Sequence, residues 1–329
     1  MAWDPMNILQ LAKRMDGEGS MLYKIAEVVA KHDEAMNDAV WVESNRTASH
    51  VTSVRETQPS GTLRQINKGV TPTLSQVGQE VDYVGFIEDM SMVDDRLIRL
   101  APKGQKQTVR SDEDIAHLKG LSETGSSYLF YGDRTTTPGA FDGLAVRRNR
   151  VGLPGVFDMA GATAATNTSI YLVTWGKDYT HMLYPRGSKI GLSKEDFGLQ
   201  VIPDPNLQGA YLPMWISWFY FDMGVVTRYP RGLARVVNIN HAETMTNLQP
   251  LFDRMIEAIN YAPNRGREGN LVAYMNEDMF NVFDKLAFDK TVPNVYSIDS
   301  GGVRQTYFRG VPLRRSDVIS GSEPIAPSI

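Results

Sequence analysis

The chain has 329 residues, of which 42% are hydrophobic and 22% charged, and this length suits an α+β body of one or two subdomains. The absence of cysteine excludes disulfides, thiolate metal ligands and a cysteine nucleophile, and fits folding in a reducing cytoplasm. A formal net charge of −4 argues against a protein whose main role is to grip DNA, although it is compatible with lying near DNA.

No run of residues approaches the roughly 18 consecutive apolar positions of a membrane helix, and residues 1–5 lack the pattern of a secretory signal. Apolar residues at helical spacing predict short amphipathic helices at 6–15 and 20–32. Asp4 and Pro5 have the residue types of a cap and a first helical position. We expect residues 1–50 to form an arm that either docks on its own chain or packs against a neighbouring subunit.

Residues 51–90 have the pattern of an extended hairpin with little hydrophobic cover. A strand is predicted at residues 51–57, a turn at 67–69 and a second strand that leads back through 79–87. Large apolar residues are scarce from 58 to 79, and an isolated hairpin is marginally stable in water. The segment is therefore either a solvated loop or a structure stabilised by another molecule, which is the main physical indication of an interaction protein.

A long helix is predicted over residues 111–131. Ser111 and the acids at 112–114 suit a helix N-terminus, and Gly132 suits its end. Gly120 and Gly125 lower its intrinsic stability, so the helix must pack along much of its length.

The second half of the chain alternates strands and helices. Strands are predicted at residues 169–175, 181–184, 200–202, 215–226, 234–239, 271–275, 303–308 and 311–315. Helices are predicted at 247–261 and after a cap at Asn276. The tail, residues 321–329, contains two prolines and small polar residues and is expected to be loosely ordered.

Titratable residues converge on no recognisable catalytic or metal site, and no cofactor is predicted. The five histidines lack metal-ligand spacing, and phosphate-binding, dinucleotide and nucleophile motifs are absent from the sequence. The acids at 94–95 and 112–114 are interpreted as helix N-terminal residues on a solvated face. The basic cluster at 147–150 could meet DNA or an acidic neighbour, or form a solvated loop.

Four stretches carry a resemblance to a known family. They are LRQINKGV at 63–70 with Pro72, LFYGD at 129–133 with the segment up to Leu144, NTSIYLVTWG at 167–176, and PRGS at 185–188 with the segment up to Gly198. Taken in order, they span most of residues 60–315. The chain resembles a family of major capsid proteins of tailed bacteriophages that have the Hong Kong 97 capsid fold.

The resemblance implies an α+β, Hong Kong 97-like fold with five regions. They are an N-terminal arm (1–50), an E-loop hairpin (51–90), a P-domain-like region with a spine helix at 111–131 (91–240), an A-domain-like α/β region (241–320) and a C-terminal tail (321–329). In this fold the E-loop lies across an adjacent subunit. We therefore expect inter-subunit contacts from Arg55, Arg64, Gln65, Asn67, Lys68 and Pro72.

The implied function is a structural one, with no catalysis, cofactor or metal. Pentamers and hexamers would assemble into an icosahedral shell that encloses double-stranded DNA without reading its sequence. Scaffolding and portal proteins are the expected partners, the host bacterial cytoplasm the expected place of assembly, and the virion the final location, with no membrane contact. An encapsulin-like compartment and a soluble hydrolase remain as alternatives. The hydrolase predicts a discrete pocket with perturbed acids, whereas a shell protein predicts broad interfaces.

Overall fold

The computed structural model describes residues 34–101, 106–161, 166–188, 190–204, 207–241, 244, 247–263, 268–289, 295–300 and 303–329. The helices expected at 6–15 and 20–32, and with them most of the expected arm, lie outside these described residues. Within them, no helix is long and apolar enough to span a bilayer.

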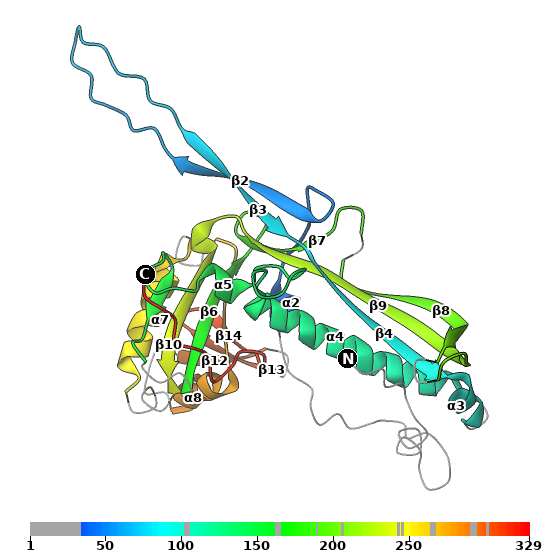
Figure 1. Cartoon of the computed structure of the whole chain (residues 1–329). Helices are drawn as coiled ribbons and strands as arrows, with labels where there is room; N and C mark the ends of the chain where they lie inside the picture. The colour runs from blue at the N-terminus through cyan, green and yellow to red at the C-terminus, as the bar shows by residue number, and fades with distance from the viewer. Residues whose placement is uncertain are drawn as a thin grey trace.

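A mixed sheet forms the body of the molecule (Figure 1). β6 (Asn167–Trp175) pairs antiparallel with β10 (Leu233–Asn240) and with β11 (Asn270–Met275). Beyond β11 the sheet continues through β14 (Val311–Arg315), β13 (Val303–Phe308) and β12 (Val295–Ser300). Every residue of β6 and β10 is buried, as continuous runs of β-branched and apolar residues predict for strands covered on both faces.

Two hydrophobic cores lie on opposite faces of β6, because side chains alternate along a strand. Ile170 and Leu172 belong to one core, which is covered by α7 (Gln249–Tyr261) and α8 (Glu277–Asp289). Tyr171 and Val173 belong to the other, together with the C-terminal end of α4 (Lys106–Tyr131). Asn276 caps α8 as predicted, since its Oδ1 accepts a hydrogen bond from the Met279 N–H at 3.1 Å.

A three-stranded arm extends from the body alongside α4 (Figure 1). It consists of β4 (Gly85–Asp94), the long β9 (Tyr211–Thr227) and β8 (Leu192–Pro203). The short strand predicted at 200–202 is in fact twelve residues long. Its first half contains the polar run from Ser193 to Asp196 and a glycine follows at 198, so the pattern of a strand is interrupted there, and most of its side chains are exposed.

The helix predicted to begin at Ser111 begins at Lys106, so the acids at 112–114 lie inside it and do not cap it. The extra turn buries Val109 against Leu97 and Ile98 of α3 (Asp95–Leu100). The end at Tyr131 is confirmed. Asp94 caps α3 by accepting from the Arg96 N–H at 2.7 Å, so the N-terminal interpretation holds for Asp94 and is wrong for the acids of α4.

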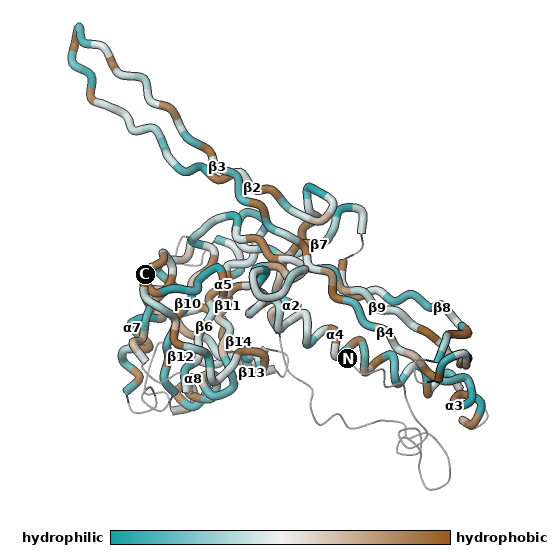
Figure 2. Tube along the Cα trace, viewed as in Figure 1, coloured by the Kyte–Doolittle hydropathy of each residue, from teal (hydrophilic) through white to brown (hydrophobic). Residues whose placement is uncertain are grey.

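The hairpin is made by β2 (Ser49–Thr57) and β3 (Gln76–Tyr83), which pair from Ser49 with Tyr83 to Thr57 with Gln76. Residues 58–75, which include the predicted turn at 67–69, form no strand. The predicted return strand at 79–87 is divided between β3 and β4. In Figure 1 the hairpin projects away from the body, and Figure 2 shows that its extended end is largely polar with isolated hydrophobic positions.

Short elements complete the body. They are α2 (Ala35–Asp38), β1 (Trp41–Glu43), β7 (Thr180–Tyr184), α5 (Leu144–Arg147), β5 (Val156–Asp158) and a 3-10 turn, η2 (Pro230–Gly232). β7 pairs parallel with β1 and antiparallel with the end of β9. It thereby joins the arm to the central sheet.

Candidate functional site

The projecting part of the hairpin exposes large apolar side chains to solvent. Leu63, Ile66 and Leu74 are exposed to 105%, 92% and 85% of their full area. Residues 55–74 are all exposed, so the described part of the chain offers them no cover. An apolar group placed in water is unfavourable, and a hairpin with no core of its own is marginally stable. This segment is therefore the clearest candidate in the molecule for contact with another chain.

Six residues were predicted to make that contact, and the structure places all of them on the hairpin. Arg64, Gln65, Asn67 and Lys68 lie together around the turn. The turn depends on Asn67, whose φ of 64° lies in the left-handed region that asparagine tolerates. The Lys68 N–H donates to the Gln65 carbonyl at 3.2 Å, and Arg64 Nε donates to the Lys68 carbonyl at 2.8 Å.

The other two predicted residues lie away from the turn. Arg55 is in β2, where it pairs with Val77, and Pro72 is on the return segment. The structure therefore brings four of the six together. The exposed Leu63 and Leu74 were not predicted, although a bulky apolar residue in an otherwise polar loop is a signal in the sequence.

Arg147 fixes the root of the hairpin to the body. Its Nη2 lies 2.5 Å from the Asp82 carboxylate of β3 and donates to the Val225 carbonyl at 2.7 Å, while its Nε donates to the Asp142 carbonyl at 3.0 Å. Arg148 likewise donates to the Leu233 and Pro230 carbonyls. Arg147 and Arg148 of the basic cluster are thus bound by acceptors of their own chain, so the interpretation as a solvated loop does not hold for these two residues.

Two histidines pack against each other at the same root. His50 of β2 and His181 of β7 lie edge to face, with ring centroids 5.8 Å apart. Burial, then the nearby His50 and Arg228, lowers the pKa of His181 to about 4, and burial lowers the pKa of His50. Both imidazoles are therefore neutral at pH 7.

Ion pairs fasten α4 to the arm. Arg110 pairs with Asp196 of β8, and Lys194 of β8 pairs with the buried Asp114. His117 lies 2.6 Å from Asp89 of β4 and 3.6 Å from Glu113. Hydrogen bonds to Glu113 and then to Asp89 raise the pKa of His117 to about 9, so it is a cation at neutral pH.

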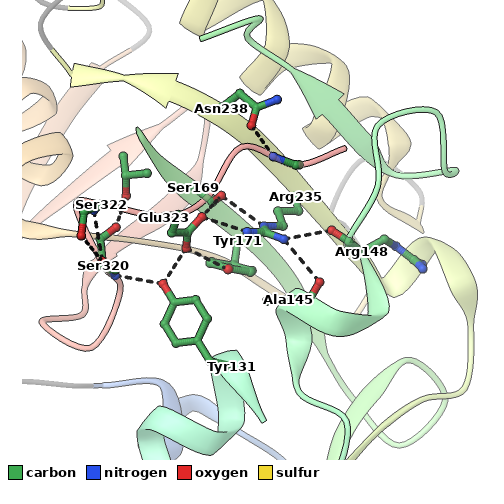
Figure 3. A network of polar contacts seen from close by, with 12 residues as sticks. Tyr131, Ala145, Arg148, Ser169, Tyr171, Arg235, Asn238, Ser320, Ser322 and Glu323 are labelled. Carbon is green, nitrogen blue, oxygen red and sulfur yellow. Dashed lines mark hydrogen bonds and ion pairs between the residues drawn. The ribbon is translucent and has the colours of Figure 1, made fainter. Parts of the chain in front are cut away.

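The C-terminal tail is docked, so the expectation that it is loosely ordered is wrong. Glu323 is 3% exposed and pairs with Arg235 of β10 at 2.8 Å (Figure 3). Tyr131 and Tyr171 donate hydrogen bonds to Glu323 Oε1, and the Ser169 hydroxyl donates to Oε2. These four partners come from α4, β6 and β10, so one carboxylate ties the tail to three elements.

A cavity of about 450 Å³ opens beside the tail, lined partly by Tyr131, Asp133, Asn149 and Ile325. Its buried acid, Glu323, is already held by Arg235 and three hydroxyls. Asp133 is partly exposed, and hydrogen bonds from Thr135 lower its pKa. Neither acid is poised to accept or donate a proton in a reaction. The described residues also contain no group of three His, Asp or Glu side chains that could hold a metal ion.

Solved structures with a related architecture are phage capsids and shells. A structure of bacteriophage Epsilon15 matches 100% of this chain and 99% of that chain, with a TM-score of 0.75 and 23% identity. The bacteriophage JBD30 capsid matches 89% of this chain and 93% of its own, with a TM-score of 0.40 and 10% identity. The SrpI encapsulin of Synechococcus elongatus PCC 7942 matches 66% and 93%, with a TM-score of 0.43 and 9% identity.

The Epsilon15 likeness confirms the Hong Kong 97-like α+β capsid fold, whereas the encapsulin likeness is weaker. No curated protein sequence matches the chain significantly. The family model for the major capsid protein GP7 matches residues 16–325, which is nearly the whole chain. The chain therefore belongs to the GP7 family of phage major capsid proteins, whose role is structural and not enzymatic.

Proposed function

We propose that this capsid protein assembles into pentamers and hexamers of an icosahedral shell, with the projecting hairpin as a principal contact between subunits. The observation that carries the proposal is the exposure of Leu63, Ile66 and Leu74 on a hairpin that has no core. Covering these side chains with a neighbouring subunit would remove apolar area from water, at roughly 25 cal/mol per Å².

The regions of the chain follow from this role. Residues 51–90 act as the E-loop and include the contact residues Arg55, Arg64, Gln65, Asn67, Lys68 and Pro72. Residues 1–50 form the arm, 91–240 the P-domain-like region with the spine helix, 241–320 the A-domain-like region and 321–329 the tail. Rings of five and six copies use heterologous contacts, in which a projection of one copy meets a different surface of the next.

The shell encloses double-stranded DNA without reading its sequence. A net charge of −4 supports this, because a wall with a marked basic excess would hold its cargo tightly. We further propose that a scaffolding protein and a portal protein take part, and that assembly takes place in the host bacterial cytoplasm.

The test replaces residues 58–75 with Asn-Gly. Thr57 and Gln76 are already paired, so a two-residue turn can close β2 on β3 without disturbing the body. The shortened chain should fold, with circular dichroism and thermal unfolding close to those of the full chain, and should fail to form shells by electron microscopy. A second variant, L63S/I66S/L74S, keeps the loop length and removes only the apolar contacts.

The full chain, expressed with its scaffolding protein, is the control and should give closed shells. Normal shells from both variants would refute the role of the hairpin. A full chain that remains a monomer under these conditions would refute the proposal as a whole.

A further inference from the structure

The root of the hairpin lies on a face of β7 that is separate from the two hydrophobic cores of the body. Met182 of β7 belongs to the core that includes the end of α4, and its neighbours His181 and Leu183 point to the opposite side because side chains alternate along a strand. On that side Leu183 packs with Val84 and Val226 in a cluster of three buried residues. Apolar packing therefore holds the hairpin root much more thinly than it holds the body.

The rest of this seam is made by two imidazoles. His50 of β2 lies edge to face with His181 of β7, with ring centroids 5.8 Å apart. His181 is 2% exposed, and neither of its ring nitrogens makes a hydrogen bond to a described residue. A neutral imidazole always carries one N–H, so a polar ring occupies a buried position where an apolar side chain would be more stable. Such a position indicates a role other than stability.

The groups around His50 leave its ring neutral. Burial lowers the pKa of His50 and is the largest influence on it. Asp82 of β3, directly opposite His50 in the strand register, acts in the other sense, but its carboxylate is already paired with Arg147. Arg228, which follows β9, adds to the effect of burial because it disfavours a second cation nearby.

His181 is held neutral more strongly than His50. Burial, then His50 and Arg228, lowers its pKa to about 4. The Gly176 carbonyl and Asp178 favour the charged form with smaller effects, and Asp178 is itself paired with Arg228. The seam therefore opposes a positive charge for as long as the hairpin root stays in place.

Acid acts against this closed arrangement. An imidazole that reaches water regains a pKa near 6.5, so proton binding favours an open root at any pH below that value. For His181 alone, the ratio of open to closed molecules rises roughly fiftyfold between pH 7 and pH 4.5. A charged His50 adds to this ratio, because two cations then face each other across the seam.

The connections of the hairpin allow it to turn as a unit. β2 and β3 are paired with each other, β2 is joined to β1 by residues 44–48, and β3 is joined to β4 by Val84 alone. Beyond its root the hairpin projects away from the body (Figure 1), and residues 55–74 are exposed. The central strands of the body, β6, β10 and β11, contain no histidine. A proton-driven change at the root can therefore reorient the hairpin and leave the body folded.

We propose that the contact between His50 and His181 is an acid-sensitive latch, whose protonation loosens the hairpin root from β7 and lets the hairpin change its direction. The ion pair of Asp82 with Arg147 keeps the root attached, so the hairpin turns about this point and is not released. The latch is a property of the single subunit and is independent of the proposed shell function. In a shell, the same protons would alter the contact that we propose for the hairpin.

The test exploits the absence of cysteine from the chain, which allows two spin labels to be attached at chosen positions. Ser53→Cys places one label at an exposed position of β2, and Lys285→Cys places the other at an exposed position of α8 in the body. Double electron–electron resonance on the unassembled chain measures the distances between the labels at pH 7 and pH 4.5. At pH 4.5 a second population of distances should appear.

The matched control is H50F/H181F in the same labelled chain, which keeps two aromatic rings at the seam and removes both titratable groups. Its distance distribution should be the same at both pH values. H50L/H181L provides the same control with smaller side chains, in case two phenylalanines overpack the seam. A second label pair, Glu257→Cys with Lys285→Cys, lies wholly in the body and should report no change.

Three results would overturn the latch. The first is an unchanged distribution at pH 4.5 in the chain that has both histidines. The second is an equal second population in the variants that lack them, which would assign the change to other groups. The third is a change between the two body labels at pH 4.5, which would show that the body unfolds together with the hairpin root.

Discussion

The hairpin tip and the C-terminal tail have similar compositions and opposite environments. Both are rich in proline and small polar residues, and neither has a hydrophobic run. Yet Leu63 of the tip is fully exposed, whereas Glu323 of the tail is 3% exposed. The tail finds hydrogen-bond partners within its own chain: Arg235 donates to Glu323, and Asn238 and Val151 accept from the Ala326 and Ile329 N–H groups. The tip bonds only to itself among the described residues, through Arg64, Gln65 and Lys68, which indicates that order in such segments depends on the surface they meet more than on their own residues.

The largest test of this comparison removes the acid that docks the tail. Glu323→Ala should lower the free energy of unfolding by about 3–5 kcal/mol, because it leaves the Arg235 guanidinium buried without its partner. Urea unfolding of the unassembled chain measures the change. Glu277→Ala is the control, since its pair with Arg315 is exposed and should contribute under about 1 kcal/mol. Equal effects from the two variants would contradict the docking role of Glu323.

A smaller effect is expected from pH at the hairpin root. The pKa of His181 is about 4 in the folded protein and near 6.5 when unfolded, so the unfolded state binds more protons as the pH falls. The stability associated with neutral His181 is fully present above pH 6.5 and is lost as the pH falls toward 4. The free energy of unfolding falls by up to about 3 kcal/mol over this range. His117 acts in the opposite sense, because its raised pKa contributes stability below pH 6.5 that is lost as the pH rises through about 9.

The measurement compares urea unfolding of the wild-type chain and His181→Leu at pH 7 and pH 4.5. The variant should lose less stability between the two values, since the leucine replaces a buried imidazole that has no hydrogen-bond partner among the described residues. His117→Gln is the control, and its free energy of unfolding should fall between pH 7 and pH 4.5 by about as much as that of the wild-type chain. An unchanged loss in His181→Leu would show that other groups cause it.

The smallest effect concerns Arg147. Arg147→Ala should lower the free energy of unfolding by about 2 kcal/mol, because Asp82 and the Val225 carbonyl lose a charged donor. Hydrogen exchange should accelerate most in β2 and β3, which Arg147 holds to the body. The ion pair of Arg228 with Asp178 is exposed, so Arg228→Ala should change neither the free energy of unfolding nor the hydrogen exchange of β2 and β3. Uniform acceleration over the whole chain would argue against a local anchor.

The elements of the body could be predicted because their signals are local. β6, β10 and β11 are rich in β-branched and apolar residues, and α7 and α8 have apolar stripes at helical spacing. β8 could not be predicted over its full length, since it gains its strand conformation by pairing with β9. The docked tail depends on a pair of residues 88 positions apart, which no pattern within either segment reveals.

The candidate site divides in the same way. The hairpin was predicted to need an outside contact because it has too few apolar residues to form a core of its own. The turn around Asn67 was predicted from its residue types. The proximity of Glu88 in β4 to Glu195 in β8 was missed. These acids are more than a hundred residues apart and share a sheet face only because both strands are registered on β9.

The single strand β9 has a mechanical consequence. Its first part pairs with β4 in the arm, and its last residues, from Gly224 to Thr227, pair with β7 in the body, without a linker between them. The arm and the body therefore share one continuous strand, so a change in the orientation of the arm is coupled to the orientation of the body. A closed surface needs different angles between neighbouring subunits. On the proposal that residues 58–75 contact a neighbouring subunit, this segment can change its path without breaking any strand pairing, because none of it lies in a strand.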